Sequence, residues 1–193
     1  MAKQSTFIEE MMAAGRGVIG LVIGDRQAGS YFDFSRRGLA GSFIAFLLIT
    51  GLNAVLPLVL GDRDPGGIAR SILMVAILFA MQVAFSAIVL RQIKRLDGLV
   101  PYLVADNWAT FFLTLISAAL AAAGLSGDPV LIVLGIVVLV VEVNIARLIV
   151  TLSPLQIAMF LIAQVVGVSI GLIVIGFTFP LPPDVAAQLN SLG

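Results

Sequence analysis

Five long apolar stretches divide the sequence, and each one ends at charged residues, glycine or proline. A helix needs about 20 residues, at about 1.5 Å each, to cross about 30 Å of hydrocarbon. The stretches lack the alternation of apolar and polar residues that is typical of barrel strands. We therefore expect an all-α integral membrane bundle of five transmembrane helices. The predicted spans are residues 38–60, 68–90, 107–125, 129–150 and 154–179.

The composition indicates a membrane protein and excludes several kinds of chemistry. Hydrophobic residues make up 60% of the chain and charged residues 11%, whereas a soluble domain carries about 25% charged residues. The formal net charge is zero, which gives no reason to expect nucleic acid as a partner. The chain has no cysteine and no histidine, so thiol catalysis, thiolate metal sites, Ser-His-Asp triads and histidine ligation of haem are excluded. We expect no catalytic residue, no metal and no cofactor.

Lys and Arg are distributed unevenly over the connections between the predicted spans. Two of the eleven, Arg63 and Arg70, border the first connection. The other nine belong to the N-terminal segment and to the second and fourth connections: Lys3, Arg16, Arg26, Arg36, Arg37, Arg91, Lys94, Arg95 and Arg147. Cytoplasmic loops carry the excess of basic residues. We therefore expect a multi-pass protein of the cell inner membrane with a cytoplasmic N-terminus and a short periplasmic tail, residues 180–193.

Residues 1–37 form a segment before the first span and contain a predicted amphipathic helix. Glu9 and Glu10 stand where a signal peptide would be basic, so we expect the segment to be retained. Apolar residues share one side of a helical wheel: Phe7, Ile8, Met11, Met12, Val18, Ile19, Leu21 and Val22. This pattern fits a helix in the membrane interface and a cytoplasmic helix packed on the ends of the spans equally well.

A glycine motif in the same segment matches the dinucleotide-binding fingerprint G-x-G-x-x-G at Gly15, Gly17 and Gly20. The fingerprint binds a dinucleotide only where it joins a strand to a helix in a βαβ unit. The surrounding residues predict a helix and no sheet. We therefore interpret the glycines as flattening a lipid-facing helix.

Four of the predicted spans carry a polar residue at a similar depth. Counting about 1.5 Å per residue, Gln82, Glu142 and Gln164 lie about 12 to 13 Å from the cytoplasmic ends of their spans, and Thr114 lies close to this level. Intramembrane polar residues are costly and are candidates for function. Without a second acid, a histidine or a broken helix in the predicted spans, hydrogen bonding between helices is the favoured role of Glu142, and a proton or cation site is the alternative.

Other residues of the spans have predicted structural roles. Tyr102 and Trp108 are expected to anchor the third span at the cytoplasmic headgroup level, because aromatic residues gather there. Arg147 is expected to extend to the same interface. Gly167 and Gly171 form a G-x-x-x-G pattern, which predicts close packing against another helix.

The sequence Tyr-Leu-Val-Ala-Asp-Asn-Trp at residues 102–108 is similar to bacterial Yip-domain sequences. With five spans after a cytoplasmic segment, short connections and a brief outside tail, residues 35–180 resemble the Yip family of integral membrane proteins. Eukaryotic members associate with Rab GTPases and act in membrane traffic, so the resemblance implies a role among other membrane proteins. Their Asp-Leu-Tyr-Gly-Pro signature is absent here, and the resemblance implies no binding residue.

The sequence favours a non-enzymatic inner-membrane protein, a Yip-like scaffold or accessory subunit of a membrane complex. Its expected partners are the lipid bilayer and other membrane proteins or a second copy of the chain, with no nucleic acid. A small transporter or channel component that uses Glu142 is the alternative. A membrane enzyme that uses Asp62, Asp64 or Asp97 is a third possibility, although residues 62–66 are typical of a turn.

Overall fold

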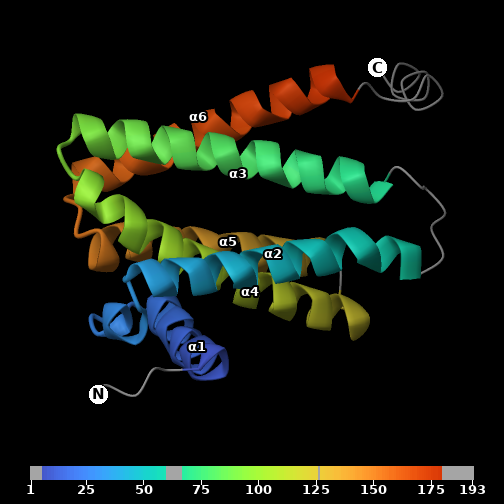
Figure 1. The fold of residues 1–193 in the computed structure, drawn as a ribbon, viewed down its shortest axis with the longest axis horizontal. Helices are drawn as coiled ribbons and strands as arrows, with labels where there is room; N and C mark the ends of the chain where they lie inside the picture. Colours follow the sequence, from blue (N-terminus) through green and yellow to red (C-terminus); the bar gives the residue numbers. More distant parts are fainter. Residues whose placement is uncertain (1–5, 60–66, 126, 180–193) are drawn as a thin grey trace.

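The protein is a bundle of long helices, seen in a computed structural model that describes residues 6–59, 67–125 and 127–179 (Figure 1). Its α-helices are α1 (Phe7–Ile23), α2 (Arg36–Val59), α3 (Gly67–Gln92), α4 (Leu99–Ala122), α5 (Asp128–Asn144) and α6 (Pro154–Thr178). Three short helical turns connect them, η1 (Ala28–Tyr31), η2 (Leu96–Gly98) and the π-helical η3 (Ile145–Ile149). No strand occurs among the described residues, so the all-α prediction is confirmed.

Five helical stretches are long and apolar enough to cross a membrane, as predicted. They are Arg36–Leu56, Gly67–Gln92, Leu96–Ala122, Asp128–Ile149 and Pro154–Thr178. The third stretch begins well before the predicted start at Asn107, because the helix continues through the polar pair Asp106 and Asn107 that interrupts the apolar pattern. The predicted turn at residues 62–66 and the predicted tail at 180–193 lie outside the described residues.

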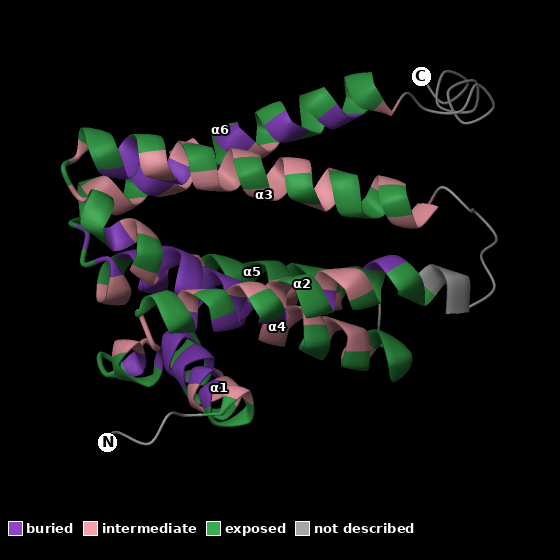
Figure 2. Cartoon of the chain, in the orientation of Figure 1, coloured by how far each residue is buried: buried purple, intermediate pink, exposed green. Residues whose placement is uncertain are grey.

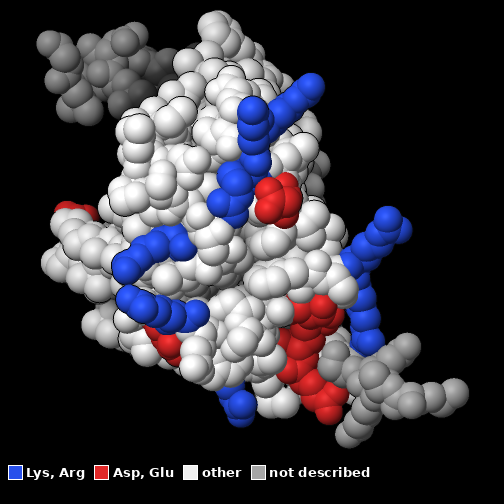
Figure 3. Space-filling view, turned by 90° about the vertical axis from the view of Figure 1, so that its left-hand side faces the viewer, with Lys and Arg blue, Asp and Glu red and all other residues white. Residues whose placement is uncertain are grey.

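The helices form two groups that meet at one end of the bundle (Figure 1). α3 lies along α6, and α2 lies along α4, with α5 beside α4. α1 packs across α4 and α5 near the end where α3 passes into α4 and α5 into α6. Buried residues gather towards this end (Figure 2), and Lys and Arg side chains protrude from it (Figure 3). We refer to it below as the basic end.

The glycines of α6 bring it close to α3. A Cβ atom on Gly167 would lie 3.0 Å from the ring of Phe85 and 3.1 Å from the carbonyl oxygen of Met81. A Cβ atom on Gly171 would lie 3.0 Å from Leu78. The G-x-x-x-G face therefore packs against a helix of the same chain.

We predict that Gly167→Ile lowers the thermal stability of the protein in detergent, because its side chain would be forced into α3. Overpacking of this kind costs about 1 to 3 kcal/mol. Gly176→Ile is the matched control on the same helix, since nothing lies within 4 Å of its Cβ position. Equal melting temperatures for the two variants would contradict the packing described here.

The glycines of α1 face the protein. A Cβ atom would lie 2.6 Å from the Phe32 ring at Gly17, 3.1 Å from Ala28 at Gly20 and 3.1 Å from Phe112 at Gly15. The interpretation of a lipid-facing glycine surface is therefore wrong, because these glycines allow α1 to approach η1 and α4 closely. A separate face of α1 leaves apolar side chains exposed: Ile8, Met12, Ile19, Val22 and Ile23.

Glu10 is a buried acid in the contact between α1 and the bundle. Its carboxyl group packs against Gly41, where Oε1 lies 2.5 Å from the position that a Cβ atom would take. Oε1 has no hydrogen-bond partner. Burial, together with the nearby charge of Asp33, raises the pKa of Glu10, while Arg37 and a hydrogen bond from the Trp108 side chain oppose the increase. The folded protein therefore holds a proton on Glu10 at a pH where the unfolded chain has released it.

A raised pKa in the folded state gives stability that is present at low pH and is lost as the pH rises from about 4.5 through the folded pKa. We predict that Glu10→Gln removes this loss, so that the variant becomes progressively more stable than the wild type as the pH rises. The fluorescence of Trp108, the only tryptophan, reports unfolding at each pH. A stability difference that does not vary with pH would contradict the assignment.

Candidate functional site: a carboxyl pair

Tyr102 is the centre of a hydrogen-bond cluster that joins three helices. It lies in the first half of α4 and is fully buried, with its ring edge-on to Phe160 of α6. Its hydroxyl oxygen accepts hydrogen bonds from Nε2 of Gln82 on α3, at 2.8 Å, and from Nε2 of Gln164 on α6, at 2.9 Å. Two residues of the predicted polar layer thus converge on a side chain that was predicted to lie at the membrane surface.

Asp106 lies one helical turn after Tyr102 and faces Glu142 of α5. Asp106 is only 6% exposed, and Nε2 of Gln82 lies 3.4 Å from its Oδ2. The carboxyl groups of Asp106 and Glu142 are in side-chain hydrogen-bond contact. Two carboxyl groups can make such a bond only when one of them carries a proton. We call these two residues the carboxyl pair.

In the described part of the chain, the polar neighbours of the carboxyl pair are amide and hydroxyl groups. The amide of Gln164 lies near Glu142, and Oε2 of Glu142 is buried without a hydrogen-bond donor. Among the described residues, no Lys or Arg acts on either carboxyl group. An uncompensated charge inside a membrane is costly. The state in which the pair holds a proton is therefore more stable than the state in which both carboxyl groups are ionised.

Glu142 lies between two cavities, one on each side of α5. The cavity between α4 and α5 has a volume of about 340 Å³ and is lined by Asp106, Thr110, Thr114 and Glu142 among others. The cavity between α5 and α6 has a volume of about 370 Å³, and Gln82, Glu142 and Gln164 contribute to its wall. Asp106 is therefore buried, whereas Glu142 is half-buried beside two cavities that are partly open to the outside of the bundle.

The predicted polar layer is only partly a single cluster. Gln82, Glu142 and Gln164 lie together, and Thr114 lies two helical turns beyond Asp106 on α4, where it lines the first cavity. Thr114 is therefore a neighbour of the cluster through the cavity and has no hydrogen bond to the other three.

The aromatic residues predicted as interface anchors are in the protein core. Tyr102 is fully buried, and Trp108 is 1% exposed and packs against Phe7 and Phe112. The prediction differs because α4 begins at Leu99, which places both residues inside the helix. Arg147 is exposed in η3 at the basic end, and its position at the membrane interface stays a prediction.

Polar side chains also connect the turns at the basic end. The guanidinium of Arg95, between α3 and α4, donates hydrogen bonds to the carbonyl oxygens of Val150 and Thr151 and to the Thr151 hydroxyl. Thr151 has a φ of 57°, a conformation that side chains rarely adopt. Nδ2 of Asn144 donates to the carbonyl oxygen of Leu21, at 2.7 Å, which fixes the end of α1.

Asp106 and Tyr102 are the members of the site that the sequence interpretation missed. Both were assigned to the segment before the third span, because the apolar stretch begins only after them. Their spacing of four residues places them on one face of a helix, and this spacing was the available signal. It needed the additional knowledge that the helix begins near Leu99.

The described residues include no group of three or more Asp or Glu side chains that could hold a metal ion. Comparison of the chain with protein-family models, with curated proteins and with solved structures gave no significant match.

Proposed function

We propose that the chain is a non-enzymatic multi-pass protein of a bacterial inner membrane that binds and releases protons at the carboxyl pair, as a transport or channel component. The observation that carries this proposal is the hydrogen-bond contact between Asp106 and Glu142 inside an apolar bundle. The predicted spans contain a single acid in the polar layer, which favours a structural role for Glu142. The second acid reverses that preference.

The neighbours of the pair suit a proton better than a metal ion. Divalent cations take six or more oxygen ligands or a nearly octahedral shell, whereas only two carboxyl groups meet here. Nε2 of Gln82 and of Gln164 donates towards the site, and an N–H group repels a cation. Amide and hydroxyl groups can hydrogen-bond to a carboxyl group whether or not it is ionised, so the cluster can accommodate both protonation states.

A Yip-like scaffold or accessory subunit is the second candidate. It is favoured by the bonds of Tyr102 to Gln82 and Gln164, which join α3, α4 and α6 and give the cluster a purely structural use. In this case the chain would act through other membrane proteins or a second copy of itself. The carboxyl pair would then hold a proton permanently.

The two candidates differ in what Glu142→Gln does. For a proton site, the protein reconstituted in vesicles should show a pH-driven proton flux that Glu142→Gln and Asp106→Asn abolish. Both variants should remain folded, because the substituted amide keeps the shape and the hydrogen bonds of the acid. Asp97→Asn is the control, since this side chain is 75% exposed and should leave the flux unchanged.

For a scaffold, the wild type should show no flux, and Glu142→Leu should lower the stability in detergent by about 1 kcal/mol through lost hydrogen bonds. Infrared spectra recorded over a range of pH give an independent measure of proton binding. A protonated carboxyl band that titrates in the wild type and is absent from Glu142→Gln supports the proton site. A band that persists at every pH at which the protein is folded supports the scaffold.

The orientation follows from the distribution of basic residues. We propose that the basic end, with Arg91, Lys94, Arg95 and Arg147, faces the cytoplasm. α1 then lies on the cytoplasmic side, where its exposed residues Ile8, Met12 and Ile19 can contact the membrane interface while its other face packs on the bundle.

A reporter enzyme that is active only in the periplasm tests this orientation. We predict activity when it is fused after Gly193 and none when it is fused after Arg95. Three predicted spans lie between these two fusion sites, so the sites are on opposite sides of the membrane. Protein levels of both fusions must be comparable. Activity of the Arg95 fusion would mean that the bundle is inverted.

A further inference from the structure

Polar residues that take no part in the cluster gather in the half of the bundle away from the basic end. They line two cavities and comprise Thr50, Asn53, Ser71, Thr110, Thr114 and Ser117. Hydroxyl and amide groups along a cavity wall can hold water, whereas a lipid-filled groove needs no such groups.

The first cavity runs from the carboxyl pair towards the far ends of α4 and α5. Its wall extends on α4 from Asp106 to Ser117 and on α5 from Glu142 to Leu131. Eleven residues of helix correspond to about 16 Å. The cavity has a volume of about 340 Å³, larger than a single water molecule needs, and apolar side chains such as Leu113 and Leu134 line it beside the polar ones.

The second cavity extends this polar region to the ends of α2 and α3. It has a volume of about 370 Å³ and shares Thr110 and Thr114 with the first cavity. Its other polar residues are Thr50 and Asn53 on α2 and Ser71 near the start of α3. Asn53 and Ser71 are exposed, so the region ends at the surface away from the basic end.

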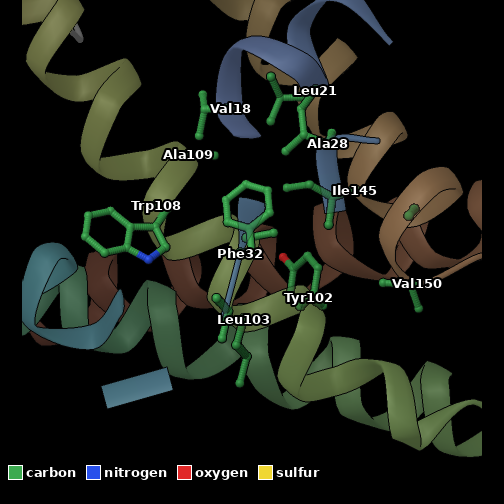
Figure 4. Close-up of a cluster of buried hydrophobic side chains, with 14 of the residues drawn as sticks. Val18, Leu21, Ala28, Phe32, Tyr102, Leu103, Trp108, Ala109, Ile145 and Val150 are labelled. Carbon is green, nitrogen blue, oxygen red and sulfur yellow. The ribbon is translucent and has the colours of Figure 1, made fainter. Parts of the chain in front are cut away.

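On the other side of the carboxyl pair, packed side chains fill the bundle. Tyr102, Phe160, Ile145 and Val150 are each at most 1% exposed, and Figure 4 shows Tyr102, Ile145 and Val150 within one cluster of buried side chains. Arg95 ties the turns at this end together. The pair is thus separated from the basic end by a closed core.

We propose that the carboxyl pair exchanges protons with the aqueous phase away from the basic end, through a water-filled passage lined by Thr110 and Thr114, and is closed towards the basic end. The passage rests on the proposed function. It adds to that function the side of the membrane from which protons reach the carboxyl pair. With the basic end in the cytoplasm, that side is the periplasm.

The absence of cysteine from the chain makes single-cysteine labelling a direct test. Thr114→Cys and Thr110→Cys place a thiol on the passage wall, and Leu115→Cys is the matched control, since Leu115 is 45% exposed and lines neither cavity. A membrane-impermeant cationic methanethiosulfonate is applied separately to each side of oriented vesicles. The unfolding temperature of each variant verifies that it is folded.

The passage predicts that Thr114→Cys reacts from the side away from the basic end at least about tenfold faster than Leu115→Cys, because the reagent attacks a thiolate that apolar surroundings suppress. Thr110→Cys, which is deeper, should react more slowly than Thr114→Cys but from the same side. Equal rates for Thr114→Cys and Leu115→Cys, or faster reaction from the basic end, would overturn the passage.

The infrared titration separates the two proposals. If the carboxyl band titrates but Thr114→Cys is unreactive, the proton site stands and the passage is wrong. If the labelling follows the prediction but the band does not titrate, the water-filled region exists and the proposed proton function fails, and proton exchange through the passage fails with it. If the band titrates and the labelling follows the prediction, both proposals are supported, and modification of Thr114→Cys should then slow the titration of the band. An unchanged rate would contradict the passage as the route.

Discussion

A carboxyl group inside a membrane must hold a proton or meet a compensating charge, and the core of this protein is arranged around that constraint. Neither Asp106 nor Glu142 has a basic partner among the described residues, so each depends on the other. Their contact brings α4 to α5, and the amides of Gln82 and Gln164 bring α3 and α6 to Tyr102 on the same face of α4. The polar cluster therefore links α3, α4, α5 and α6 at one depth.

The number of spans and most of their limits were predictable, because apolar stretches of membrane length are a strong and local signal. The start of α4 was not. Asp106 and Asn107 look like the edge of a membrane span when partners are unknown. Asn107 is buried and donates to Ser42 at 3.1 Å, and contacts of this kind, made 65 residues apart in sequence, leave no local pattern.

The candidate site was predictable in its depth but not in its chemistry. Counting residues placed Gln82, Glu142 and Gln164 in one layer, and the structure brings them together. The partner of Glu142 was missed because the assigned span excluded it, and the aromatic residues at 102 and 108 were interpreted from composition alone. Predicting their burial would have required the position of α1, whose Phe7 covers Trp108.

The contacts of Arg95 with Val150 and Thr151 have a mechanical consequence. The pair of helices α3 and α6 and the group of α2, α4 and α5 are fastened to each other at the basic end, by this guanidinium and by the Tyr102 cluster. Towards the opposite end the two groups lie apart in Figure 1, with a cavity between α2, α3 and α4. The two groups are therefore held by side-chain hydrogen bonds at the basic end, whereas at the opposite end the chain between Val59 of α2 and Gly67 of α3 joins them.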